Sequence, residues 1–208
     1  MNQTEEDGMS EHGAAFLDVD TQVDFVEPGG RLYASGAEAI KANLARLVGF
    51  AREQGLPLIS SVDAHGDDDA EFGEFPPHCL RGTSGQAKLA ETTSEAMVFV
   101  PSEAGVALPD PRATHAVLEK QQFSLFTNPN AEALFQATGA KTFVVFGVVT
   151  EVCVRQAALG LLERGYRVQL VTDAVWPITA EGGAAALTEL TARGAELLTT
   201  DDVLGRLA

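Results

Sequence analysis

The stretch TFVVFGVVTEVCVRQAALGLLERG, residues 142–165, decides the fold. Its opening run, TFVVFG, is apolar and rich in β-branched and aromatic side chains, which is typical of a strand buried on both faces. From about Glu151 to Arg164 the pattern indicates a helix, and Gly165 follows as a stop. A buried strand that leads directly into a helix predicts one unit of a parallel sheet covered by helices.

The same alternation continues on both sides of this unit. Strands are expected at residues 14–20, 57–63, 97–100, 115–120, 142–147, 167–171 and 196–199, and helices at 36–53, about 129–139, 151–164 and 180–193. This order of elements predicts an α/β fold. We expect a three-layer α/β/α sandwich around a mainly parallel sheet of five or six strands.

The length of the chain favours one domain. A chain of 208 residues can fill the core of a single α/β domain, whereas two full domains would be cramped. We expect residues 14–208 to form that domain and residues 1–13, which are polar and acidic, to be a flexible tail. The opening MNQTEEDGMSEHG has neither the basic nor the apolar region of a signal peptide.

Composition excludes several classes of partner. The formal net charge of −16 would repel a phosphate backbone and an anionic membrane surface, so neither nucleic acid nor a membrane is expected as a partner. No apolar run approaches the roughly 18 residues that span a bilayer. With only 2 cysteines the chain has no disulfide framework, and reduced thiols indicate a cytoplasmic protein.

Three chemically useful side chains are expected to meet at one edge of the sheet. Asp20 and Lys120 each end a predicted strand, and Cys153 lies in the first turn of the helix after another strand. Open parallel sheets bind ligands at this edge. Each residue has an ordinary alternative, namely a turn-forming aspartate, a solvent-facing lysine and a buried structural cysteine. Their convergence favours catalysis, with Cys153 as the nucleophile.

A nucleophilic role for Cys153 needs a positive neighbour. An ordinary thiol has a pKa of about 8.5, so making it mostly thiolate at neutral pH requires a shift of roughly two units, or about 2.7 kcal/mol. The amino end of a helix supplies typically about 0.3–1 kcal/mol. Lys120 is the candidate for the remainder.

A second cluster of polar residues follows the strand at 57–63. Asp63, His65, Glu71 and His78 combine imidazole and carboxylate groups, which suit Zn²⁺, Fe²⁺ or Mn²⁺. Asp63 and His65 face the same way if the chain is extended there. The alternative is a polar surface loop, because residues 67–69 are all aspartates.

Taken together, five motifs resemble a known family. They are LDVDTQVDF (17–25), DAH (63–65), FPPHC (75–79), LEK (118–120) and GVVTEVCV (147–154). In this order they are similar to the isochorismatase-like cysteine hydrolases, whose fold is Rossmann-like, and the nicotinamidase group is the best match. The resemblance covers nearly the whole chain from Ala14 to Leu204.

This resemblance implies a catalytic triad of Asp20, Lys120 and Cys153. It also implies an oxyanion hole made by the backbone N–H groups of Val149 and Cys153, beside a cis peptide bond between Val148 and Val149. The implied reaction is hydrolysis of a small-molecule amide through a thioester.

The resemblance also implies a cofactor and a substrate. The family's metal site corresponds to Asp63, His65 and His78, with Glu71 at a position that is histidine in some members. One divalent ion, most simply zinc, is expected, with iron or manganese as alternatives.

Phe25 and Phe75 correspond to the aromatic clamp on the pyridine ring, although tryptophan is usual at the second position. Nicotinamide would yield nicotinate and ammonia, which belongs to NAD salvage. We also expect a homo-oligomer. The alternatives are another small amide or ureido hydrolase on the same scaffold, and a catalytically silent binding protein.

Overall fold

The computed structural model describes residues 13–208. Its strands are β1 (Ala14–Val19), β2 (Leu58–Asp63), β3 (Met97–Val100), β4 (His115–Lys120), β5 (Thr142–Val148), β6 (Arg167–Trp176) and β7 (Glu196–Leu198). Its α-helices are α1 (Val23–Val26), α2 (Lys41–Glu53), α3 (Ala131–Ala137), α4 (Arg155–Glu163), α5 (Ala180–Ala192) and α6 (Thr200–Leu207). Short 3-10 helices η1 (Ala37–Ile40), η2 (Ala70–Gly73), η3 (Ala90–Thr92) and η4 (Leu125–Thr127) and a π-helical turn η5 (Thr150–Val154) complete the series.

All strands of the sheet run parallel, in the order β3-β4-β2-β1-β5-β6-β7. The α/β fold class is therefore confirmed. The sheet has 7 strands where five or six were expected. Each of the seven expected strand ranges corresponds to a strand of this sheet, so the expected total of five or six was too low. The short edge strands β3, with 4 residues, and β7, with 3, both pair with their neighbours.

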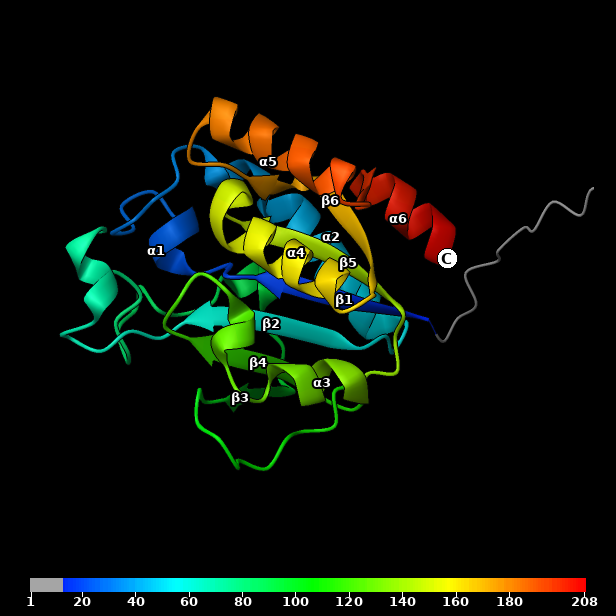
Figure 1. Ribbon diagram of the computed structural model, residues 1–208, viewed down its shortest axis with the longest axis horizontal. Coiled ribbons are helices and arrows are strands. Elements are labelled where there is room, and N and C mark those ends of the chain that lie inside the picture. The colour runs from blue at the N-terminus through cyan, green and yellow to red at the C-terminus, as the bar shows by residue number, and fades with distance from the viewer. Residues whose placement is uncertain (1–12) are drawn as a thin grey trace, which may run out of the picture.

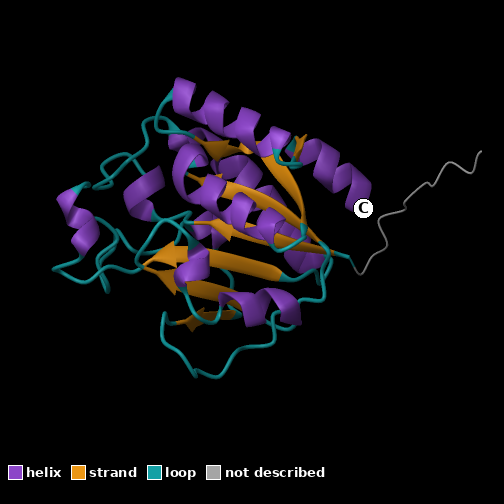
Figure 2. Cartoon of the chain, in the orientation of Figure 1, coloured by secondary structure: helices purple, strands orange, loops and turns teal. Residues whose placement is uncertain are grey.

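Helices cover both faces of the sheet and form the outer two layers (Figures 1 and 2). Leu44 and Leu47 of α2 and Val203 of α6 pack with Phe16 on one face. Leu134 of α3 and Ala157 of α4 belong to the core on the other face. The sheet is thus buried on both sides, as parallel sheets normally are.

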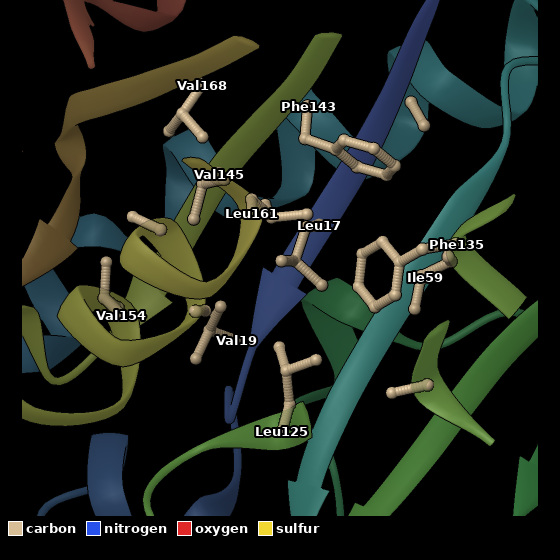
Figure 3. Packing of buried hydrophobic residues seen from close by; sticks show 14 of the residues in the cluster. Leu17, Val19, Ile59, Leu125, Phe135, Phe143, Val145, Val154, Leu161 and Val168 are labelled. Atoms are coloured by element: carbon tan, nitrogen blue, oxygen red, sulfur yellow. The ribbon is translucent and has the colours of Figure 1, made fainter. Parts of the chain in front are cut away.

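The core between β1, β2 and the second helical layer is built from alternating strand residues (Figure 3). Leu17 and Val19 of β1 and Ile59 of β2 point toward the helical layer that carries Phe135 and Val154. All of these side chains are fully buried. Burying an aliphatic or aromatic side chain contributes roughly 1.5–3 kcal/mol. This packing fixes the register of the strands, and hence the position of whatever follows their carboxyl ends.

The element boundaries differ from expectation mainly where the backbone leaves regular geometry. The helix predicted from residue 36 begins as η1, and the helix predicted from residue 151 begins as η5. α1 and α6 were not expected, since α1 has 4 residues and α6 has 8. Thr199 caps α6 through a reciprocal hydrogen-bonded box with Asp202, which a sequence search for Glu or Gln at that position misses.

Within residues 13–208, no helix combines the length and apolar character that crossing a membrane requires. The predicted tail, residues 1–13, lies almost entirely outside the described part of the chain, and the single domain over residues 14–208 stays a prediction.

Candidate active site

Four neighbouring strands, β4, β2, β1 and β5, end at the same edge of the sheet, on the left in Figure 1. The pairing places Asp63 opposite Lys120 and Val19 opposite Gly147. A Cβ atom on Gly147 would come within 2.1 Å of the Val19 carbonyl oxygen, and its φ is +120°. Only glycine permits so close an approach, and so the strand before the predicted nucleophile lies directly against the strand before Asp20.

Asp20 reaches the predicted site through an unusual backbone conformation. In a regular strand Asp18 and Asp20 would point to the same face, because side chains alternate. The φ of Asp20 is +50°, in the left-handed region that non-glycine residues rarely adopt. Its carboxylate accepts a hydrogen bond from Ser61 Oγ at 2.7 Å, and it lies with Lys120 on the face opposite to Asp18.

Lys120 is the centre of the arrangement. Its ammonium nitrogen lies 2.9 Å from Asp20 Oδ2, donates to Asp63 Oδ1 and lies 3.6 Å from Cys153 Sγ. The Lys120 side chain is 1% exposed. The structure therefore brings together the three residues that the sequence analysis selected, and their catalytic roles remain predictions.

The electrostatics of this cluster differ from the simple picture of a thiolate beside a lysine. Burial raises the pKa of the Cys153 thiol well above its usual range, and the attraction of Lys120 opposes this rise only in part. Burial also raises the pKa of Asp20, with Lys120 opposing and Asp63 adding to the rise. A thiol and a carboxylate whose pKa values are both raised thus lie together, a pairing suited to proton transfer.

Cys153, the predicted nucleophile, lies on a turn that is held at both ends. A cis peptide bond joins Val148 to Val149, as the family resemblance implied, and η5 with Cys153 follows directly. The carboxylate of Glu151 accepts hydrogen bonds from the backbone N–H groups of Ile178 at 3.0 Å and Thr179 at 2.9 Å. This contact ties the turn to the segment between β6 and α5. The assignment of the Val149 and Cys153 amides as an oxyanion hole stays a prediction.

The predicted metal ligands gather beside the cluster of Asp20, Lys120 and Cys153. Asp63, His65 and His78 are buried, and each offers a ligand atom within 4.8 Å of the others. The Nε2 atoms of His65 and His78 lie 3.7 and 3.8 Å from Asp63 Oδ2. Glu71 stands outside this trio, but its Oε1 lies 3.6 Å from His78 Nε2.

These residues fit a divalent cation chemically. The Nε2 atoms of both histidines are buried, and neither makes a hydrogen bond to any residue in the described part of the chain. Orphaned imidazole nitrogens facing a carboxylate are costly unless a ligand satisfies them. Burial lowers the pKa of His65, but Asp63 and Asp69 outweigh it and raise the pKa to about 8. A cation would take the place of that proton.

Two residues that the sequence analysis left without a role hold the site together. Gln22 donates from Nε2 to the Asp63 carbonyl at 2.9 Å and accepts from the Asp63 N–H at 2.7 Å. Asp24 is 4% exposed and accepts from the backbone N–H groups of Arg31 and Cys79. Both follow Asp20, the predicted base, by a few residues, and a run of polar residues directly after a buried strand was the available signal.

The two aromatic residues predicted to bind substrate have different ring neighbours. The ring of Phe25 contacts the His78 ring, with centroids 5.3 Å apart, and its side chain is buried. Phe75 is half-buried and meets Phe123 edge-on, with centroids 6.0 Å apart. Their role as a clamp stays a prediction.

Curated relatives cover most of the chain at low identity. The chain is similar to a protein from Arabidopsis thaliana described as a probable inactive nicotinamidase, with 27% identity over 80% of this chain and 82% of that protein. It is 26% identical to maleamate amidohydrolase from Pseudomonas putida, over 93% and 86% of the two chains. It is 25% identical to nicotinamidase/pyrazinamidase from Mycobacterium tuberculosis, over 88% and 97%.

Solved structures resemble the chain over nearly its whole length. An isochorismatase-like hydrolase from Alkaliphilus metalliredigens matches with a TM-score of 0.80 and 25% identity, covering 94% of this chain and 100% of that one. The pyrazinamidase of Pyrococcus horikoshii in complex with zinc matches with a TM-score of 0.74 and 27% identity, covering 89% and 98%.

The family model of the isochorismatase domain matches residues 14–202, from the first residue of β1 into α6. This range contains every residue of the catalytic cluster and of the candidate metal site. The chain therefore belongs to the isochorismatase domain family of hydrolases.

Proposed function

We propose that this protein is a cysteine amidohydrolase that cleaves a small-molecule amide through a thioester, and that its substrate is nicotinamide. The observation that carries the proposal is the position of Lys120, whose ammonium lies between the Asp20 carboxylate and the Cys153 sulfur at 2.9 and 3.6 Å. A scaffold protein has no need for this combination of buried charges around a thiol, because each uncompensated charge would destabilise it.

In the proposed mechanism Asp20 removes the thiol proton as Sγ attacks the amide carbonyl carbon. Lys120 stabilises the negative charge that moves from the carboxylate to the sulfur and back. The backbone N–H groups of Val149 and Cys153 hold the oxyanion of the tetrahedral intermediate. Loss of one such donor typically lowers the rate about 10²–10³-fold.

The second half of the reaction uses the same groups in reverse. Asp20 passes its proton to the departing nitrogen, which leaves as ammonia, and Cys153 is left as a thioester. Asp20 then removes a proton from water, which attacks the thioester carbon. The products are the free acid and the regenerated thiol.

Asp63, His65 and His78 would hold one divalent cation, with Glu71 able to join them, and zinc is the proposed ion. The zinc complex of the Pyrococcus horikoshii protein supports this choice. When bound, the ion would offer a Lewis-acidic position to an acceptor atom such as a pyridine nitrogen. Phe25 contacts the His78 ring, so it would lie on the same side of the substrate as the ion.

Ammonia release from a panel of amides tests the proposal. The panel contains nicotinamide, pyrazinamide, benzamide, maleamate, biuret and a carbamoyl compound. We expect kcat/KM for nicotinamide to exceed that for benzamide, which has the ring but no acceptor nitrogen. Phe75→Ala should weaken nicotinamide turnover more than turnover of an aliphatic amide, because only the ring buries a flat face.

Cys153→Ala serves as the control in this assay and should abolish turnover on every substrate. If no amide of the panel released ammonia, the result would favour a catalytically silent binding protein instead. The Arabidopsis relative is itself described as a probable inactive nicotinamidase.

A second candidate is an amidase for a smaller, non-aromatic amide or ureide. One observation favours it: Phe75 is engaged by Phe123 rather than by the buried ring of Phe25. Activity on maleamate or a carbamoyl compound with none on nicotinamide would select this candidate and leave the catalytic cluster as proposed.

With nicotinamide as substrate, the product nicotinate would place the enzyme in NAD salvage. The two reduced cysteines are compatible with the proposed cytoplasmic location. The homo-oligomeric state remains part of the proposal.

A further inference from the structure

The loop after β2 contains three consecutive aspartates, and one of them differs from the other two. Asp67 and Asp68 are exposed, whereas the Asp69 side chain is 13% exposed. Asp69 is turned toward the candidate metal site, while its two neighbours face solvent. A run of acidic residues that resembles a plain polar surface therefore hides one residue with specific contacts.

Both carboxylate oxygens of Asp69 contact a proposed metal ligand. Oδ1 accepts the backbone N–H of Glu71 at 3.0 Å and so caps the amino end of η2, the turn that carries Glu71. Oδ2 lies 2.9 Å from Nδ1 of His65, which is fully buried. This second contact is close but oblique, so the ring nitrogen is not yet fully satisfied.

The position of Asp69 bears on which nitrogen of His65 carries a proton. A neutral imidazole has one N–H and one lone pair, and a partner that accepts from Nδ1 leaves the lone pair on Nε2. His78 has the matching arrangement, because its Nδ1 lies 2.9 Å from the Pro76 carbonyl oxygen. In both rings the opposite nitrogen, Nε2, faces Asp63.

We infer that Asp69 is a positioning residue of the metal site: one carboxylate holds His65 in the tautomer and orientation that present Nε2, and also fixes the turn that carries Glu71. The inference rests on the metal site proposed above and assigns a residue that lies beyond its four candidate ligands. Outer partners of this kind typically change metal affinity about 10–100-fold when removed.

Titration calorimetry of Zn²⁺ into the metal-free, tag-free chain tests the inference. Asp69→Ser keeps a capping oxygen for Glu71 but cannot reach His65. Asp69→Asn keeps the length of the side chain, but its amide can donate to Nδ1 and so favour the wrong tautomer. We expect both variants to bind Zn²⁺ about 10–100-fold more weakly than the wild type. Asp68→Asn, which makes the same charge change in the same loop, should bind like the wild type.

The tautomer itself provides a readout that does not depend on metal. Long-range ¹⁵N–¹H correlation spectra of the metal-free protein, recorded at a pH above the His65 pKa of about 8 so that the ring is neutral, should show the His65 proton on Nδ1 in the wild type and in Asp68→Asn. In Asp69→Asn the proton should move to Nε2, while His78 stays unchanged and reports an intact fold.

The possible failures can be told apart. The wild type could bind Zn²⁺ with the same affinity as all three variants, Asp69→Ser, Asp69→Asn and Asp68→Asn. That result would overturn the role of Asp69 and leave the proposed metal site standing. A wild-type chain that takes up no Zn²⁺, Mn²⁺ or Fe²⁺ would overturn the proposed metal site and the role of Asp69 with it.

Discussion

Two buried aspartate–lysine pairs lie at the carboxyl end of β1, where Asp18 is inside the strand and Asp20 directly follows it, and the two pairs differ in character. Asp18 pairs with Lys88 at 2.6 Å, and Asp20 pairs with Lys120 at 2.9 Å. All four side chains are at most 1% exposed. The two aspartates are two positions apart in sequence, but their lysines lie on opposite faces of the sheet.

The difference lies in how fully each carboxylate is satisfied. Asp18 accepts hydrogen bonds from Thr21 Oγ1 at 2.8 Å, Ser60 Oγ at 2.9 Å and Lys88, so all its contacts are structural. Asp20 has Ser61 on one oxygen and shares its lysine with a second carboxylate and a thiol. A carboxylate whose hydrogen-bonding positions are all filled stabilises the fold. A carboxylate with fewer partners keeps an affinity for a proton, which a catalytic step can use.

The largest expected effect comes from replacing each aspartate by asparagine, which should separate the proposed catalytic role of Asp20 from the structural role of Asp18. Asp20→Asn removes the proposed base, so kcat/KM should fall by roughly 10³-fold or more. Burial raises the pKa of Asp20, which means that its ionised form costs stability at neutral pH, and the variant should unfold no more easily than the wild type.

Asp18→Asn is the matched control. It leaves Lys88 buried without its charge partner, so the free energy of unfolding should fall by about 3–5 kcal/mol. The folded fraction should keep most of its activity. Urea unfolding and steady-state kinetics on both variants provide the check, and a loss of activity in Asp18→Asn equal to that in Asp20→Asn would end the distinction.

The hydrogen-bond network around Asp18 should also make the free energy of unfolding depend on pH. His115 extends the Asp18 network, with Nε2 2.7 Å from Ser60 Oγ and Nδ1 3.1 Å from Ser94 Oγ. Burial lowers the pKa of His115 from 6.5 to about 4, with the charges of Lys88 and Arg52 also lowering it and that of Asp18 opposing. Between these two values the unfolded chain binds a proton that the folded chain does not.

The free energy of unfolding should therefore fall as the pH drops from 6.5 to 4, by up to about 3 kcal/mol from this residue. His115→Gln should flatten the profile by that amount. Urea unfolding of both proteins at several pH values measures the difference, and parallel profiles would mean that His115 is not the titrating group.

The smallest expected effect concerns the two thiols. Cys79 is fully buried and Cys153 is 7% exposed at the catalytic edge. Burial and the charge of Asp63 raise the pKa of Cys79, and the charge of Lys120 opposes this rise. Iodoacetamide should label Cys153 about tenfold faster, with activity lost in step. Mass spectrometry of the labelled peptides decides this, and early labelling of Cys79 with activity retained would contradict the nucleophile assignment.

Much of this site could be anticipated from local sequence signals. Asp20 and Lys120 were found because each ends an apolar run, and Cys153 because it follows the clearest strand in the chain. The carboxyl ends of parallel strands meet at one edge of a sheet, so residues that follow different strands could be expected to lie close together. The trio of Asp63, His65 and His78 was expected from residue type and from the family resemblance together.

The remainder depended on contacts that no local pattern encodes. The positive φ of Asp20 separates it from Asp18, yet the run LDVD looks like regular alternation. Ser61 and Gln22 act through partners about 41 positions away, and Asp69 is indistinguishable in sequence from the aspartates beside it. The raised pKa of Cys153 reflects burial, which outweighs the attraction of Lys120 and which composition does not reveal.

Asp63 divides its two oxygens between two tasks, with Oδ1 on Lys120 and Oδ2 toward the histidines. A substitution at Asp63 would therefore alter the charge around Cys153 as well as the candidate metal site, and its phenotype would report on neither alone. His78 offers the cleaner knock-out, because it has no contact with Lys120 in the described part of the chain. The same sharing constrains evolution, since a descendant that dispensed with a metal could lose its histidines far more easily than Asp63.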